Sequence, residues 1–481
     1  MLLAYHFELK INNRLATILG CLTYAASKLF NIGNYERNEF QVLGFKKMPN
    51  WYEQKKRLKD SIWYKSLPSQ SSQDVLSRLD EAWSSYSALR RKWLDKKDRG
   101  LLKDNDGEPN PPKYKKNREH TNVKYLNNSF KVIGKKIRFM IPKSLKKYLK
   151  EKHHVGDEFF YINLKNEFET IKQVEFSYIE KNRYKVYIIY EKEAPKQRED
   201  NKRYISIDIG AKNLLTIYDN NGSSFIIGSQ SILNTNYYFS KKIAYFQSLL
   251  DKCYPNHKKG ETSKRIKHLF ELKKKRINLI LHKATRRVID YCLSHNITKI
   301  IVGDLSGLLS SKKDFINGNK KHHFNQTIRS ICYRKIYHNL SYKSIMNGFE
   351  LIKVDESYSS SCSPLSPTVS REYSSKDFRV YRGLFKVDNN VYNADSVGAF
   401  NIMRLYRQTN SLDFNMPLKG LSNPRRECIP VTDQFLDEDY INWNGKSGNV
   451  GISGRNYPSG YELELFVTQS ITKILSKSIV E

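Results

Sequence analysis

The sequence predicts an α+β protein of several domains, and three observations support this. The chain has 481 residues, which is long enough for two to four domains. Strand patterns rich in β-branched and aromatic residues fill 122–192, and a second set begins at 204. Between patterned regions lie a Pro/Gly-rich break, KDNDGEPNPPKYKKNREH, and a charged linker, EAPKQREDNKR, which mark domain boundaries.

The charge balance indicates a polyanionic partner. Lys and Arg number 83 against 49 Asp and Glu, a formal net charge of +34. A folded chain with this charge favours nucleic acid through counterion release, although a merely soluble basic protein is an alternative. The sequence has no apolar run near ~18 residues, so we expect no membrane partner. Its start lacks a cleavage-type signal.

The N-terminal half combines strands with helices. Residues 1–35 have the pattern of a strand followed by a helix, and LPSQSSQDVLSRLDEAWSSYSALRRKWL has that of an amphipathic helix. A hairpin is expected around Gly134, followed by further short strands up to 192. Several short strands in succession predict a small β-barrel, a common platform for nucleic acid.

The C-terminal half begins with the strands YISIDI, LLTIYD and SSFIIG, the last two joined by a turn at Asn220-Asn221-Gly222. A long helical region follows, with an apolar stripe and a dense basic face. The strand NITKIIVGDL, a helix ending at Gly348, the strand FELIKVDE and the short helix NADSVGAFNIMRLY come next. From 409 onward, low periodicity predicts a partly disordered tail.

Three acidic residues stand at strand or helix ends and are candidate metal ligands: Asp208, Glu356 and Asp395. Carboxylates on a sheet and a neighbouring helix can hold two Mg²⁺ ions for phosphodiester cleavage. Each has an alternative. Asp208 could face solvent, Glu356 could be a surface charge, and Asp395 could be a helix N-cap.

The ordered set ISIDIGAKNLLTIYD, ITKIIVGDLSG, VDESYSSSC and RGLFKVDNNVYNADSVGAFNIMR closely resembles the split RuvC nuclease of the transposon-encoded TnpB family. Miniature type V CRISPR effectors share this nuclease. The similarity covers 204–406 and is looser upstream. It implies an N-terminal β-barrel (wedge) with an inserted helical recognition domain, and a C-terminal RNase H-like (RuvC) α/β domain with a small insert.

The resemblance also implies domain boundaries. We expect a wedge-like barrel from 1–35 and 112–200, with a helical recognition domain at 36–111. The nuclease domain would comprise 201–360 and 391–408. A target-nucleic-acid-binding insert would fill 361–390, and the tail would span 409–481.

This sequence departs from the family pattern at the second nuclease strand. The family usually has a glutamate there, but this chain has Gly303 followed by Asp304. In one branch the glutamate stands on the next strand, which corresponds here to Glu356. Neighbouring strands lie ~4.8 Å apart, so the displaced carboxylate could reach the same place. Asp304 remains a competitor, although strand alternation would point it to the other face.

A second departure concerns zinc. Most relatives carry two CxxC pairs between the second and third nuclease strands. Here Cys362 is followed by Leu365, and the second pair is replaced by Val387 and Asn390. We therefore expect no zinc, and a packing role for Cys362. The six cysteines form no CxxC pair, which favours a reducing compartment.

Basic residues on the long helix and in the insert are candidate contacts to nucleic acid, with a solvated helix face as the alternative. They are Lys273, Lys274, Lys275, Arg276, Lys283, Arg286, Arg287 and Arg382. His322-His323 lies in a loop that resembles a mobile lid of the family and is expected to be solvated.

The resemblance implies an RNA-guided DNA endonuclease that uses two Mg²⁺ ions, a guide RNA and target double-stranded DNA beside a short duplex motif. The expected location is the bacterial cytoplasm, at the nucleoid. Two alternatives stay open: a nuclease-inactive guided DNA-binding repressor, motivated by Gly303 and the missing cysteines, and an RNA-independent recombination nuclease or transposase.

Overall fold

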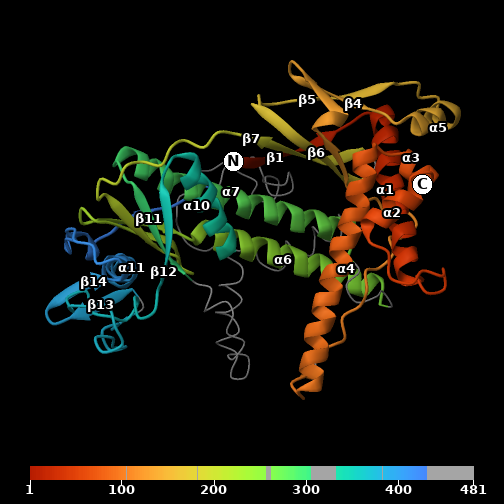
Figure 1. Cartoon of the computed structure of the whole chain (residues 1–481). Coiled ribbons are helices and arrows are strands. Elements are labelled where there is room, and N and C mark those ends of the chain that lie inside the picture. The colour runs from red at the N-terminus through yellow and green to blue at the C-terminus, as the bar shows by residue number, and fades with distance from the viewer. Residues whose placement is uncertain (104–105, 181, 256–261, 305–331, 382, 431–481) are drawn as a thin grey trace. The chain divides into compact units, whose positions relative to one another are not determined.

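The computed structural model divides the chain into two compact units, residues 1–195 and a second unit that begins at 196 (Figure 1). The residues it describes are 1–103, 106–180, 182–255, 262–304, 332–381 and 383–430. Both units mix helices and strands, so the predicted α+β class is confirmed.

The strands of the first unit form two sheets. The four-stranded antiparallel sheet has the order β1-β7-β6-β2 and the three-stranded one has the order β3-β4-β5. The strands are β1 (Leu2–Lys10), β2 (Val123–Leu126), β3 (Phe130–Ile133), β4 (Lys136–Met140), β5 (Phe159–Asn163), β6 (Thr170–Glu180) and β7 (Arg183–Glu191). The predicted hairpin around Gly134 is confirmed as β3–β4, with Gly134 at φ 54°.

The expected barrel needs a correction, because the described strands of the first unit close no barrel. The 3-10 turn Asn127–Ser129 carries the chain from β2 in one sheet to β3 in the other, so strand pairing is interrupted there. Aromatic rings pack together on strands of both sheets. Phe139 and Phe160 stack with centroids 4.9 Å apart, and Tyr125 and Phe176 meet Phe139 edge-on. These rings form one buried core between the two open sheets.

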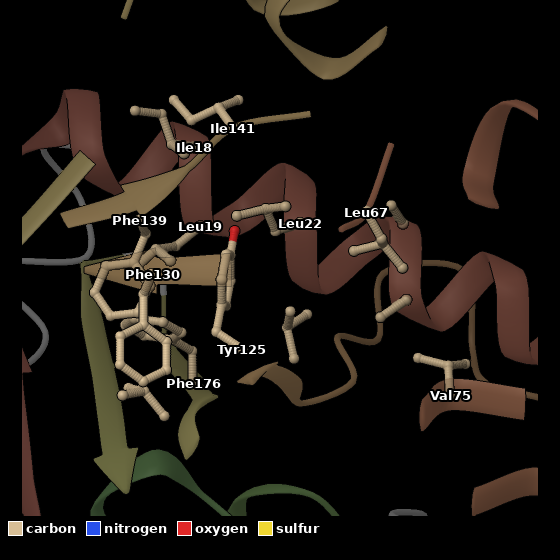
Figure 2. Packing of buried hydrophobic residues seen from close by; sticks show 14 of the residues in the cluster. Ile18, Leu19, Leu22, Leu67, Val75, Tyr125, Phe130, Phe139, Ile141 and Phe176 are labelled. Atoms are coloured by element: carbon tan, nitrogen blue, oxygen red, sulfur yellow. The ribbon is translucent and has the colours of Figure 1, made fainter. Parts of the chain in front are cut away.

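Helices cover the core of the first unit. They are α1 (Asn13–Asn38), α2 (Trp51–Leu58), α3 (Ile62–Lys65), α4 (Ser69–Asp98) and α5 (Lys143–His153). Figure 2 shows Leu22 of α1 beside Tyr125 and Ile18 of α1 beside Ile141. By length and composition alone α1 could cross a membrane. Its apolar residues are buried in this core, so we interpret it as a core helix.

The second unit is built on a six-stranded mixed sheet of order β12-β11-β8-β9-β10-β15. Strands β8, β11 and β12 run parallel, while β9 is antiparallel to both β8 and β10. The strands are β8 (Tyr204–Asp208), β9 (Asn213–Asp219), β10 (Ser223–Gly228), β11 (Lys299–Asp304), β12 (Glu350–Asp355) and β15 (Arg425–Glu427). The predicted turn between β9 and β10 is confirmed, with Gly222 at φ 87°.

Helices pack on both faces of this sheet. One face buries Ile205, Ile207 and Val302 against α7 (Lys264–Ser294) and α10 (Tyr333–Met346). Helix α6 (Gln230–Cys253) lies beside α7 (Figure 1). The other face buries Tyr204 and Ile301 against α11 (Ala394–Thr409) and the hairpin of β13 (Leu384–Val387) and β14 (Asn390–Asn393).

The start of the predicted tail is ordered. Residues 419–421 form a 3-10 turn, η3, and β15 pairs in parallel with β10 as the edge strand of the sheet. Arg287 of α7 donates to both carboxylate oxygens of Glu427, at 2.7 and 2.9 Å. A three-residue strand leaves too little periodicity in the sequence to be predicted. The rest of the tail, 431–481, lies outside the described residues.

The packing of α1 on α4 gives a stability prediction. A Cβ at Gly33 would lie 2.9 Å from Leu79 and 3.0 Å from Leu76, both fully buried. In Gly33→Ala, overpacking of about 1–3 kcal/mol should exceed the helix-propensity gain of about 1 kcal/mol. We expect the free energy of unfolding of the first unit to fall by about 1 kcal/mol.

Urea unfolding followed by tryptophan fluorescence measures this, because four of the five tryptophans lie in the first unit. The control is Gly20→Ala in the same helix, where the nearest atom, Tyr184 Oη, is 3.8 Å away. That variant should be as stable as the wild type or more stable. A Gly33→Ala protein that matches Gly20→Ala would contradict the predicted overpacking.

Candidate active site

Asp208 ends β8 on the face that α11 covers. Ile205 and Ile207 point into the α7/α10 core, so Ser206 and Asp208 must point the other way. Ser206 Oγ donates a hydrogen bond of 2.6 Å to the carbonyl of Ala399 in α11. A Cβ on Gly398 would lie 2.7 Å from Asp208 Oδ2, so only glycine leaves room for this carboxylate under the helix.

Glu356 follows directly after β12 and continues its alternation. Ile352 and Val354 of that strand pack against the α11 cluster, which places residue 356 on the same face. A Cβ on Gly303 would lie only 2.5 Å from Glu356 Oε2 and 3.0 Å from Ile402 Cδ1 of α11. The carboxylate of Glu356 thus occupies the space that a side chain at position 303 would enter.

Asp304 belongs to the opposite face. Its Oδ1 lies 3.8 Å from Lys353 Nζ, and that ammonium group sits 4.1 Å from the ring centroid of Tyr337 in α10. The alternation expected from the sequence therefore agrees with the structure at 303 and 304.

Asp395 is in the first turn of α11, and it is not the helix N-cap. Asn393 takes that role, because its side-chain oxygen accepts from the backbone N–H groups of Asp395 and Ser396, each at 3.1 Å. Asn213, at the start of β9, donates to Asp395 Oδ2 at 2.5 Å. Arg379 Nη2 lies 3.8 Å from Asp395 Oδ1. The Asp395 side chain is therefore free of the capping role and is held from both sides.

The charges of Glu356 and Asp395 both act on Asp208. Burial, followed by the negative charges of Glu356 and Asp395, raises the pKa of Asp208 to about 7, and Arg379 partly opposes this rise. Burial, with the charges of Asp304 and Asp355, raises the pKa of Glu356 to about 7. The charged form of both carboxyl groups is therefore unfavourable, and a bound proton or a bound cation would neutralise it.

A divalent ion fits this donor set. Carboxylate oxygens are the ligands that Mg²⁺ prefers, and glycine at 303 and 398 admits the carboxylates of Glu356 and Asp208, which a larger side chain would displace. Across the described ranges, no three Asp, Glu, His or Cys side chains already converge as a metal-binding group. Like charges repel, so carboxylates that approach without a cation are expected to stand further apart than they do around one.

Three residues near these acids were not singled out from the sequence: Arg379, Asn213 and Tyr333. Tyr333 opens α10, and burial together with the charges of Asp208 and Glu356 raises its pKa to about 12. Asn213 lies five residues after Asp208 but 182 residues before Asp395, the acid it contacts, so only the tertiary fold shows this contact. The sequence signal nearest to Arg379 is the basic run that also contains Arg382, and Arg382 lies outside the described residues.

Of the positions that correspond to zinc ligands in relatives, two are buried here and two are exposed. Cys362 is fully buried, with Sγ 3.3 Å from Ser366 Oγ. Leu365 is exposed, while Val387 and Asn390 pair across the β13–β14 hairpin.

The candidate nucleic-acid contacts on α7 differ in their exposure to solvent and in their side-chain partners. Lys274 and Arg286 are exposed, the latter paired with Asp290 at 2.8 Å. Arg287 is engaged by Glu427, and Lys283 Nζ reaches the carbonyl of Pro430 at 3.4 Å. The half-buried ones are Lys273, whose Nζ donates to Ser240 Oγ at 3.2 Å, Lys275 and Arg276. His322-His323 lies outside the described residues.

Residues 187–309 match the model of the OrfB_IS605 family, described as a probable transposase. This match confirms the resemblance to the TnpB family predicted from the sequence. The matched segment contains Asp208 and Gly303 and ends before Glu356 and Asp395. No curated protein matches the chain significantly.

Solved structures align over most of the chain at low similarity. The mini-RNA-guided endonuclease CRISPR-Cas_phi3 aligns with 10% identity over 86% of this chain and 94% of that chain, with a TM-score of 0.42. A Cas12f1–sgRNA–target DNA complex aligns with 14% identity over 84% of this chain and 100% of that chain, with a TM-score of 0.32. Scores at this level do not establish a shared fold.

The raised pKa values predict how stability depends on pH when divalent ions are removed. Carboxyl groups in unfolded chains have pKa values near 4, whereas Asp208 and Glu356 reach about 7 in the folded chain. Between about pH 4 and pH 7 the folded state therefore binds more protons than the unfolded state does. The free energy of unfolding then falls as pH rises from about 5.5 to 8. We expect the melting temperature of the second unit in EDTA to decrease over this range.

The matched control is Asp208→Asn, which removes one titrating group with little change in volume. Its melting temperature should fall less between pH 5.5 and 8 than that of the wild type. An identical pH dependence of the two proteins would show that Asp208 is not the strained carboxyl group.

Proposed function

Since residues 187–309 match the model of the OrfB_IS605 family of probable transposases, we propose that this chain is an RNA-guided DNA endonuclease of the TnpB type. In this proposal a guide RNA pairs with one strand of DNA next to a short duplex motif, and the RNase H-like second unit cuts the DNA. The observation that best supports cleavage is the interaction of the Glu356 and Asp395 charges with Asp208 on one face of the sheet.

Asp208, Glu356 and Asp395 would hold two Mg²⁺ ions. The ions would supply Lewis-acid activation of water and stabilisation of the leaving oxygen during phosphodiester hydrolysis. The chain's own groups fix the geometry. Strand β8 presents Asp208 beneath α11, and Asn213 orients Asp395 through the bond to its Oδ2. Arg379 adds positive charge beside Asp395, where it could meet a phosphate oxygen of the DNA.

The formal net charge of +34 supports a partnership with guide RNA and target DNA. We further propose the domain roles implied by the family. Residues 1–35 and 112–200 would act as the wedge around the 36–111 recognition helices. Residues 361–390 would handle the target strand beside the nuclease domain of 201–360 and 391–408. Among the α7 residues that were singled out from the sequence, Lys274 and Arg286 are the exposed ones, and we propose that they contact a phosphate backbone.

The first test of this proposal is isosteric neutralisation of each acid. We expect Asp208→Asn and Glu356→Gln to reduce guided cleavage of plasmid DNA in Mg²⁺ by more than about 100-fold, because each removes a charged ligand of the ions. Guided binding of DNA, measured by gel shift in EDTA, should remain.

Asp304→Asn is the control, since Asp304 points to the opposite face of the sheet, and it should keep cleavage. Loss of cutting in Asp304→Asn with full cutting in Glu356→Gln would identify Asp304 as the ligand instead. Guided binding with no cutting by the wild type would favour the repressor alternative. Cutting by nucleic-acid-free protein would favour the RNA-independent nuclease.

A second test moves the carboxylate between strands. Glu356 Oε2 fills the space in front of Gly303, so Gly303→Glu alone should abolish cleavage by forcing two side chains into one place. Glu356→Ala alone should abolish it by removing a ligand. The double variant Gly303→Glu/Glu356→Ala has one carboxylate in that space and should recover activity above both single variants.

The measurement is the cleavage rate of the wild type, the two single variants and the double variant, each with the same guide and target. A double variant no more active than either single one, although folded and able to bind DNA, would contradict the idea that residues 303 and 356 share one position in space.

A further inference from the structure

The segment that carries Glu356 is a short turn without regular strand pairing of its own. The carbonyl of Glu356 accepts from Ser359 N at 3.0 Å, and the carbonyl of Tyr358 accepts from Cys362 N at 3.0 Å. Tyr358 adopts a left-handed backbone with φ 64°. Local bonds of this kind shape the turn but do not fix where it stands relative to Asp208 and Asp395.

Asn401 of α11 anchors both ends of this turn. Its side chain is fully buried, and its Nδ2 donates to the carbonyls of Ser359 and Cys362, each at 2.8 Å. One amide group therefore ties the helix to two points of the turn, three and six residues after Glu356.

Arg404, one helical turn later, extends the same connection. Arg404 is only 7% exposed. Nη1 donates to the carbonyl of Ser363 and to Asn401 Oδ1, each at 2.9 Å, and Nη2 donates to the carbonyl and the hydroxyl oxygen of Ser366. A planar guanidinium group can make these bonds together, whereas a lysine ammonium group on a flexible stem cannot reproduce them.

The helix that makes these bonds is also the one that positions the other acids. Asp395 lies in its first turn, Gly398 accommodates Asp208, and Ile402 borders the space at Gly303 that Glu356 fills. Because α11 is one rigid helix, its Asn401 and Arg404 set the distance between the turn and the other two carboxylates.

We propose that Arg404, together with Asn401, is a positioning residue that holds Glu356 in place for divalent-ion binding. This inference rests on the proposed function, because it takes Glu356 as a ligand. Loss of a hydrogen-bond partner of a metal ligand typically weakens metal affinity by about 10–100-fold, and we expect an effect of that order when the segment that carries Glu356 loses its anchor. A residue that only supported the fold would change stability and leave metal affinity alone.

The experiment measures Mn²⁺ binding to the full-length protein, in complex with guide RNA, by electron paramagnetic resonance. Arg404→Met and Arg404→Lys should each weaken the Asp208-dependent Mn²⁺ site by about 10–100-fold. Arg404→Lys keeps charge and most of the volume and is the variant to rely on if Arg404→Met does not fold. Hydrogen exchange should become faster in residues 356–366 of both variants.

Arg407→Met is the matched control. Arg407 is half-buried on the same helix, and its Nη1 donates to the carbonyl of Phe414 at 3.2 Å, away from the Glu356 turn. It should bind Mn²⁺ like the wild type.

Unchanged Mn²⁺ affinity in a folded Arg404→Lys protein would overturn the inference, with or without a lower melting temperature. Failure of the proposed function looks different. If the wild type does not cut guided DNA but its Mn²⁺ site still depends on Arg404, the positioning role stands and the nuclease proposal falls. If Asp208→Asn binds Mn²⁺ as tightly as the wild type, both the positioning role of Arg404 and the nuclease proposal would be overturned.

Discussion

The arrangement of the second unit depends on how closely helix α11 approaches the sheet. Ser206 bonds directly to the carbonyl of Ala399, and glycine at 398 and 303 removes the side chains that would hold the two surfaces apart. The space gained is filled by carboxylates, not by apolar groups. Glycine at these two positions therefore decides whether the half-buried carboxylates of Asp208 and Glu356 fit between α11 and the sheet.

This close approach creates an electrostatic conflict. Two carboxyl groups with pKa values raised to about 7, and a third beside them, are unfavourable as charged groups in a protein interior. Arg379 offsets only part of that charge. A purely structural site would resolve the conflict with apolar residues or paired charges. Carboxylates whose charge one arginine offsets only in part are more easily explained by a cation that binds among them, which links the packing of α11 to the proposed chemistry.

Period-two alternation was enough to predict that Asp304 faces away from position 303, because both residues lie on one regular strand. The placement of Glu356 came from the family resemblance, since a glutamate after a strand is ordinary on a surface. Alternation could not decide the role of Asp395, since Asn393 and Asp395 are equally good N-caps in sequence and only the helix start distinguishes them.

The features that the sequence did not predict also have physical causes. The predicted barrel failed because local strand patterns say nothing about where pairing stops, and a three-residue turn redirected β3 into a second sheet. The contacts of Arg379, Asn401 and Arg404 join segments distant in sequence, so no local pattern announces them. The domain roles and the metal ligands stay predictions that rest on the family resemblance and on this geometry.

The central claim is that Asp208, Glu356 and Asp395 share divalent ions. Crystals of the guide-bound protein soaked in Mn²⁺ test it most directly through anomalous difference maps. The account predicts peaks bounded by the carboxylates of all three residues, with Glu356 Oε2 as a ligand in front of Gly303. Peaks at Asp304 with Glu356 uncoordinated, or no peak on the α11 face of the sheet, would contradict it.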